Sequence, residues 1–332
     1  FWALSRFKDV FAAAVDAKTE IDPTQKTAQA SGRSPASIQV STFSDELAIL
    51  TAGRAKIFGV SVKDRGAISL AGHAGKAFWF SKAAGDFVSS RFYYREYPEW
   101  VNTWNASRPT QRYADQSWKL LNKQESYLYG DRDDESWEVN FPGYGRVFPH
   151  PFGAADGKYF TTLLTLSPVG DELTLSFAKA LIENESIGTD DVTDYLSVSF
   201  SSTDYVGHFF GPSSLETEDN LLRLDRTIAA LLKTVDDQVG LDNTLIVLSA
   251  DHGSPEVPGY LNQLGIEAKT VDPKTWDRQP GIAALKKRFG VGQQLIRTYY
   301  HPYLYLNQDV IREHGLDPVE VQTAVASEVA KF

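Results

Sequence analysis

Two short stretches place an aspartate and a histidine close together, each directly after a run of apolar residues. In "SVSFSSTDYVGH" the pair is Asp204 and His208, four residues apart, and in "LIVLSADHG" it is Asp251 and His252. Carboxylate oxygens and imidazole nitrogens are standard ligands for Zn2+ and also bind other divalent ions. Either stretch alone also fits a turn or a surface pair, but the two together favour a metal site.

The elements around these pairs predict that both lie on one edge of a sheet. Residues 194–201 and the segment "DNTLIVLSADHG" read as buried strands, and residues 215–240 between them read as a long amphipathic helix. Strand, helix and strand in this order predict a parallel sheet, whose ligands bind outside the carboxyl ends of the strands. Two metals about 3.5 to 4 Å apart can clamp the attacking and leaving oxygens of a phosphoryl group.

A third feature is the pair of cations Lys63 and Arg65 in "SVKDRGAI", after a predicted strand at 56–62. In an extended chain, side chains two residues apart point the same way, so both cations can meet one anion while Asp64 turns aside. Arginine offers a planar fork to phosphate oxygens and lysine a point charge. The alternative is a solvated strand end.

Composition excludes several classes of protein. The 332 residues are 42% hydrophobic and 23% charged, as in ordinary globular proteins. The net charge of -10 argues against a specific nucleic-acid partner, which would favour a basic face. No run reaches the 18 to 20 or so apolar residues of a membrane span, so no membrane partner is expected. The absence of cysteine excludes disulfides and thiolate chemistry.

The remaining chain predicts an α/β protein with a doubly wound, mostly parallel sheet and helices on both faces. Residues 34–53 are predicted to form one helix. Residues 76–170 are rich in Trp, Tyr, Pro and Gly and predict a long irregular insertion. Residues 254–332 predict a second insertion, with a strand in "TYYHPYLYLN" and short helices.

Three motifs together resemble the alkaline phosphatase superfamily. "SVKDRGAISLAGHAGKAFWF", "FSSTDYVGHFFGP" and "LSADHG" are similar to motifs of bacterial threonine-nucleophile alkaline phosphatases, relatives of nucleotide pyrophosphatases and phosphodiesterases. The resemblance extends over nearly the whole chain. It implies one alkaline-phosphatase-like domain over 1–332, with large inserted cap segments and incomplete at both ends.

The resemblance also implies roles for the candidate residues. Asp204 and His208 would bind one zinc ion, and Asp251 and His252 a second. Lys63 and Arg65 would contact the non-bridging oxygens of the phosphoryl group, a mark of the monoesterase branch. The implied activity is zinc-dependent hydrolysis of small phosphate monoesters through a covalent phosphoenzyme, by a monomer that is periplasmic or secreted.

The chain also departs from the family pattern. It contains no methionine and begins at Phe1, so we expect a segment of a longer chain, or one from which some residues were lost. The nucleophilic threonine, a phosphate-binding asparagine and one aspartate ligand are expected before residue 1, and a third histidine ligand after Phe332. Phe1 and Trp2 resemble the remnant of the segment that follows the nucleophile. The rival interpretations are a phosphodiesterase of the same superfamily, and an inactive metal-binding pseudoenzyme or binding module.

Overall fold

The computed structural model describes residues 33–270, 272–300 and 303–331, so Phe1 and Trp2 lie outside the described residues. Contacts separate the described chain into two units, one before Leu261 and one from Leu261 onward. Within these ranges, no helix has the length and apolar character needed to cross a membrane. The division into one domain with two cap insertions stays a prediction.

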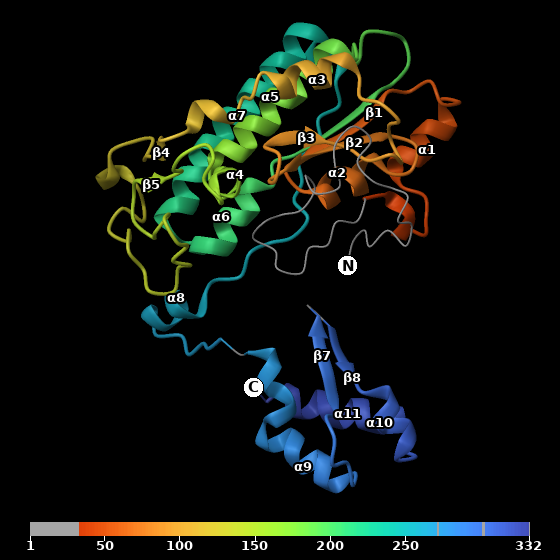
Figure 1. The fold of residues 1–332 in the computed structure, drawn as a ribbon, viewed down its shortest axis with the longest axis vertical. Helices are drawn as coiled ribbons and strands as arrows, with labels where there is room; N and C mark the ends of the chain where they lie inside the picture. Colours follow the sequence, from red (N-terminus) through yellow and green to blue (C-terminus); the bar gives the residue numbers. More distant parts are fainter. Residues whose placement is uncertain (1–32, 271, 301–302, 332) are drawn as a thin grey trace. The chain divides into compact units, whose positions relative to one another are not determined.

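A four-stranded sheet organises the first unit (Figure 1). It consists of β1 (Ile57–Ser61), β2 (Lys76–Ser81), β3 (Asp86–Val88) and β6 (Tyr195–Ser199), in the order β3-β2-β1-β6. β1 pairs in parallel with both β2 and β6, whereas β3 is an antiparallel edge strand. The carboxyl ends of β1, β2 and β6 therefore share one edge of a mixed α/β fold, as predicted.

Helices of the first unit surround this sheet. They are α1 (Phe43–Leu50), α2 (Asp64–Ala71), α3 (Glu99–Ala106), α4 (Phe160–Thr165), α5 (Pro168–Asn184), α6 (Ser202–Phe210) and α7 (Leu215–Gln238). A further helix, α8 (Pro258–Gln263), spans the boundary between the units. A short strand pair, β4 (Ser117–Trp118) with β5 (His150–Pro151), lies in the mostly irregular chain between α3 and α4.

The two faces of the sheet carry different helices. Gly59 in β1 faces α2, and a Cβ atom there would lie 2.3 Å from the carbonyl oxygen of Ala67, so only glycine permits this approach. Phe78 in β2 pairs in register with Val60 and points to the opposite face, where its ring lies 5.1 Å from that of Phe177 in α5. β1 and β2 are thus buried on both faces, as their apolar sequences predict, whereas β6 is only half-buried along its length because no strand covers its outer side in the described chain.

The second unit is a small α/β module with its own core. The hairpin of β7 (Ile296–Tyr300) and β8 (Tyr303–Leu306) packs with α9 (Pro280–Arg288), α10 (Gln308–Glu313) and α11 (Pro318–Val329). The buried residues that form its core cluster are Ile282, Leu285, Leu295, Ile296, Leu306, Ile311, Val321 and Val325. The strand predicted in "TYYHPYLYLN" is therefore two strands in this unit.

The buried strand predicted before Asp251 is wrong for the described structure. Residues 244–250 pair with no strand of the described chain, and β6 ends the sheet on its side. Leu245 is 90% exposed and Leu248 is 81% exposed. An apolar run becomes a buried strand only when a neighbouring strand satisfies its backbone, and this segment forms no such ladder.

Two other segments also differ from the predictions. The single helix over 34–53 is a 3-10 turn at Pro35–Ser37 followed by α1, because β-branched residues follow the turn and Thr42 caps a new helix. Residues 76–88, expected in the irregular insertion, form β2 and β3 of the main sheet. Their apolar run "KAFWF" is the signal of a buried strand.

Candidate active site at the carboxyl ends of β1 and β6

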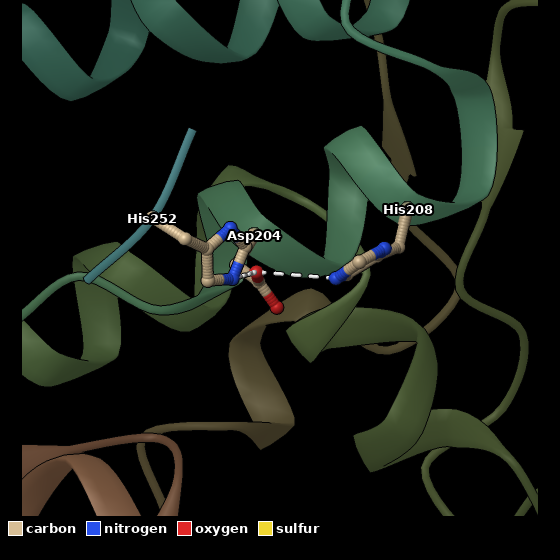
Figure 2. A group of neighbouring side chains, drawn as sticks. All are labelled: Asp204, His208 and His252. Carbon is tan, nitrogen blue, oxygen red and sulfur yellow. Dashed lines mark ion pairs between the residues drawn. The ribbon is translucent and has the colours of Figure 1, made fainter. Parts of the chain in front are cut away.

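Asp204, His208 and His252 form a cluster with the geometry of a metal site. One carboxylate oxygen and one ring nitrogen from each histidine all lie within 4.8 Å of one another. Asp204 Oδ1 lies 3.3 Å from His208 Nε2 and 3.1 Å from His252 Nε2 (Figure 2). Asp204 is mostly buried, whereas both histidines are exposed. Such a set of one oxygen and two nitrogen donors fits Zn2+ and related divalent ions.

Local structure explains how these ligands meet. Asp204 and His208 are four residues apart on α6, which places both side chains on one helix face. His252 comes from the irregular segment after α7, which brings its ring next to Asp204. The predicted parallel strand was wrong, but the predicted meeting of His252 with Asp204 is present.

The hydrogen bonds of His252 suit a metal ligand. Its Nδ1 lies 2.9 Å from the carbonyl oxygen of Gly253, so Nδ1 carries the proton and Nε2 faces Asp204. A backbone carbonyl on the second ring nitrogen is the usual device that fixes a metal-binding tautomer. The bond to Gly253 and the charge of Asp251 raise the pKa of His252 above its ordinary value.

Lys63 reaches the other oxygen of Asp204. Its ammonium bonds Asp204 Oδ2 and lies 4.4 Å from the centre of the Tyr205 ring. Burial lowers the pKa of Lys63, and the bond to Asp204 opposes this shift. Burial also raises the pKa of Asp204, but Lys63 and the two histidines outweigh it, so the net shift is downward. The carboxylate is therefore ionised, as a metal ligand must be.

Arg65 and Asp251 are exposed, and neither belongs to the group formed by Asp204, His208 and His252. β1 ends at Ser61 and α2 begins at Asp64, so the extended geometry expected for Lys63 and Arg65 is wrong. Arg65 is an exposed residue in the first turn of α2. Asp251 has an 82% exposed side chain, and its Oδ2 lies 3.7 Å from His252 Nε2. The roles of both residues, and the sharing of ligands between two zinc ions, stay predictions.

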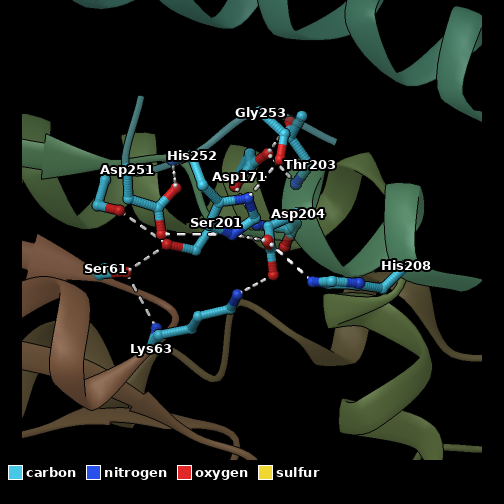
Figure 3. A network of polar contacts seen from close by, with 12 residues as sticks. Ser61, Lys63, Asp171, Ser201, Thr203, Asp204, His208, Asp251, His252 and Gly253 are labelled. Carbon is cyan, nitrogen blue, oxygen red and sulfur yellow. Dashed lines mark hydrogen bonds and ion pairs between the residues drawn. The ribbon is translucent and has the colours of Figure 1, made fainter. Parts of the chain in front are cut away.

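A chain of serine hydroxyls links the ends of β1 and β6 beneath the cluster (Figure 3). Ser201 Oγ lies 2.9 Å from Ser61 Oγ and 2.7 Å from Ser199 Oγ. Ser61 Oγ also accepts from the backbone N–H of Lys63 at 3.0 Å. These serines were not predicted from the sequence, although polar residues at the ends of two apolar strands are a visible signal.

Comparison with known proteins identifies the family. Residues 27–323 match the family model described as type I phosphodiesterase / nucleotide pyrophosphatase. The chain belongs to this family. One curated relative is the alkaline phosphatase PhoV of Synechococcus elongatus, which is 43% identical to this chain over 230 residues that cover 69% of this chain and 42% of PhoV.

A second family relative is known in sequence and structure. The alkaline phosphatase PafA of Elizabethkingia meningoseptica is 34% identical over 317 residues, covering 94% of this chain and 57% of PafA. Its wild-type crystal structure superposes with a TM-score of 0.81 at 35% identity, covering 90% of this chain and 57% of that one. The fold is thus that of this phosphatase, and the chain spans about half the length of the curated relatives it matches.

Proposed function

We propose that this chain carries the metal- and phosphate-binding part of an alkaline phosphatase that hydrolyses small phosphate monoesters. The observation that carries the proposal is the cluster of Asp204, His208 and His252 with the Lys63 ammonium bonded to the same carboxylate. A divalent-ion donor set beside a buried cation suits a substrate that carries two negative charges. The alkaline phosphatases among the relatives support this choice.

We further propose two zinc ions as the metals. Asp204, His208 and His252 would hold zinc, with Asp251 as a further ligand, and other divalent ions remain alternatives. When bound, zinc supplies Lewis-acid polarisation of a phosphoryl oxygen and local positive charge. The tautomer of His252 and the ionised state of Asp204 suit these residues to that task.

The chain's own cations would bind and orient the phosphoryl group. Lys63 is 6% exposed, so its charge acts on a nearby anion with little screening by water. Arg65 projects from the first turn of α2, two residues away, and offers a planar fork to the remaining non-bridging oxygens. Fixed positive charges of this kind stabilise the charge that develops during phosphoryl transfer. The proposed route is a covalent phosphoenzyme, whose nucleophile is expected before residue 1.

The partner and location of the protein remain proposals that rest on the resemblance. They comprise a monomer, exported to the periplasm or secreted, that acts on small phosphate monoesters. The acidic surface, with a net charge of -10, is consistent with a substrate drawn in by local metals and cations rather than by the whole molecule.

The test uses the full-length protein, its metal content and its hydrolysis of p-nitrophenyl phosphate. We expect bound zinc, loss of activity on chelation and recovery when Zn2+ is restored. Lys63→Ala should lower monoester kcat/KM by about 100-fold or more, because a charge on the transferring group is lost. Its matched control is Lys82→Ala, since Lys82 also packs 4.3 Å from the Tyr205 ring centre.

Three outcomes would contradict the proposal. Monoester hydrolysis unaffected by chelation would exclude the metal mechanism. A zinc-loaded protein without hydrolase activity would favour a pseudoenzyme. A Lys63→Ala variant that loses diester turnover as much as monoester turnover would count against the monoester clamp and favour a phosphodiesterase.

A further inference from the structure

The first turn of α6 receives its hydrogen-bond partner from another helix. Ser201 occupies the N-cap position, but its hydroxyl does not accept from the helix. That hydroxyl instead bonds Ser61 and Ser199, joining the ends of β1 and β6. The leading N–H groups of α6 therefore need an acceptor from elsewhere.

Asp171 in the first turn of α5 supplies this acceptor (Figure 3). Its Oδ1 accepts from the N–H of Ser202 at 2.9 Å. Its Oδ2 accepts from the N–H of Thr203 at 3.2 Å and from the Thr203 hydroxyl at 3.1 Å. Asp171 is 2% exposed, so these bonds are shielded from water and a misplaced partner could not be replaced by solvent.

The surrounding packing leaves this capping arrangement little freedom to shift. A Cβ atom on Gly170 would lie 2.0 Å from Ser202 Oγ and 3.1 Å from Thr165 Cα, so a larger residue there would force Ser202 or the packing between α5 and α6 to shift. From α7, the buried amide of Asn220 donates to Thr203 Oγ1 at 2.9 Å. Helices α5, α6 and α7 therefore converge on Thr203, which directly precedes the metal-site residue Asp204.

We propose that Asp171 is the positioning residue of the metal centre. It fixes the first turn of α6, and with it Asp204 and, one helical turn later, His208. Its own carboxylate does not join the Asp204 cluster. Loss of the cap lets the turn move relative to His252 and weakens zinc binding, since partners that orient metal ligands typically contribute about 10- to 100-fold in affinity. The inference rests on the metal part of the proposed function.

The experiment compares Asp171→Asn with Asp219→Asn in the full-length protein, titrated with Zn2+ against a competing chelator. Asp219 is an equally buried carboxylate that accepts from Trp118, Leu121, Tyr127 and Arg223, away from the cluster. Both variants should unfold at lower temperature when metal-free. At a temperature where both are folded, only Asp171→Asn should weaken zinc binding, by about 10-fold or more.

Equal zinc affinity in Asp171→Asn and the wild type, or equal weakening in both variants, would overturn the inference. If Asp171→Asn does not fold, Thr203→Val replaces it, with Thr203→Ser as the variant that keeps the hydroxyl. We expect Thr203→Val to bind zinc more weakly than the wild type and Thr203→Ser to bind it about as tightly as the wild type. Equal zinc affinity in the two variants, or weaker binding in Thr203→Ser than in Thr203→Val, overturns the proposal. A wild-type protein that binds no zinc also overturns it. Zinc binding without phosphatase activity would defeat only the proposed function.

Discussion

Asp204 uses its two carboxylate oxygens for different partners. Oδ1 faces the ring nitrogens of His208 and His252, and Oδ2 is bonded by Lys63. A single carboxylate can thus serve a metal on one side and hold a buried ammonium on the other. The Asp204 carboxylate offsets part of the cost of burying the Lys63 ammonium beside the candidate metal site.

His150, which lies outside the candidate metal cluster, has a structural role. His150 and Glu216 are both fully buried, with His150 Nε2 3.2 Å from Glu216 Oε1 and His150 Nδ1 3.3 Å from the carbonyl oxygen of Tyr144. Burial lowers the pKa of His150 to about 4 and raises that of Glu216 well above its ordinary value. The pair is therefore neutral: Nδ1–H donates to Tyr144, and the protonated carboxyl of Glu216 donates to Nε2.

This assignment predicts that Glu216→Gln is tolerated. The glutamine amide can donate to His150 Nε2 as the carboxyl does. At a pH of about 4, where the carboxyl is largely protonated in the folded and unfolded states alike, the free energy of unfolding should therefore change by less than about 1 kcal/mol. Glu216→Leu leaves the buried nitrogen without a donor and should cost about 1 to 3 kcal/mol. Urea unfolding followed by tryptophan fluorescence measures both, since Trp118 lies 5.4 Å from the His150 ring.

The stability of Glu216→Gln relative to the wild type should depend on pH. The folded pKa of Glu216 is raised, so its contribution to stability is complete below the unfolded value of 4.5 and decreases as pH rises above it. Glutamine does not titrate, so Glu216→Gln should gain on the wild type between pH 5 and 8, by up to about 1.4 kcal/mol per pH unit. If Glu216→Gln were instead less stable than the wild type by about 1 to 3 kcal/mol at every pH measured, Glu216 would be ionised in the folded protein.

At the scale of elements, Asp45 ties α1 to the loop that leads into β2. It completes a capping box with Thr42 and also accepts from the backbone N–H groups of His73 and Ala74. The His73 ring adds a bond at 2.8 Å. Burial raises the pKa of Asp45, but these hydrogen bonds outweigh burial and hold it well below its ordinary value.

Replacing the carboxylate should therefore loosen α1. We expect Asp45→Asn to lower the free energy of unfolding by about 2 to 3 kcal/mol at pH 7, Thr42→Ala by about 1 kcal/mol, and Thr42→Ser by much less. Because the folded pKa of Asp45 is depressed, its contribution is present above the unfolded value of 3.8 and is lost as pH falls below it. The deficit of Asp45→Asn should consequently narrow at pH 3.5, and a deficit that stays constant would contradict this account.

Elements with a strong local signal could be predicted from sequence, and those defined by partners could not. β1, β6 and α7 have clear apolar periods and were predicted close to their observed bounds. Lys63, Asp204, His208 and His252 were singled out because they are polar residues after apolar runs, and the structure places Asp204 next to the other three, while their roles stay predictions. The segment 244–250 has the same apolar character as β1, but strand formation depends on a neighbouring ladder that the sequence does not display. Asp171 was missed because a cap supplied by another helix leaves no mark at the helix that it serves.

At the scale of the whole molecule, the candidate metal centre lies in the first unit, and the second unit has a hydrophobic core of its own. Lys63, Asp204, His208 and His252 all belong to the first unit, whereas the core of the second unit lies between Ile282 and Val325. A ligand that binds only the folded form of one unit stabilises that unit, by about 2.7 kcal/mol when its concentration is 100 times the Kd. Zinc should therefore act on the two units unequally.

Hydrogen exchange measured by mass spectrometry, with and without Zn2+, resolves this difference. We expect zinc to slow exchange in peptides covering α6 and Asp251–Gly253, because the metal fixes Asp204, His208 and His252 to one another. Peptides from α9 and α11 should exchange at unchanged rates, and they serve as the internal control. Asp204→Asn, which removes a charged ligand, should abolish the protection in α6. Equal protection in α9 and α11 would mean that zinc acts on both units, and protection that persists in Asp204→Asn would place the metal elsewhere.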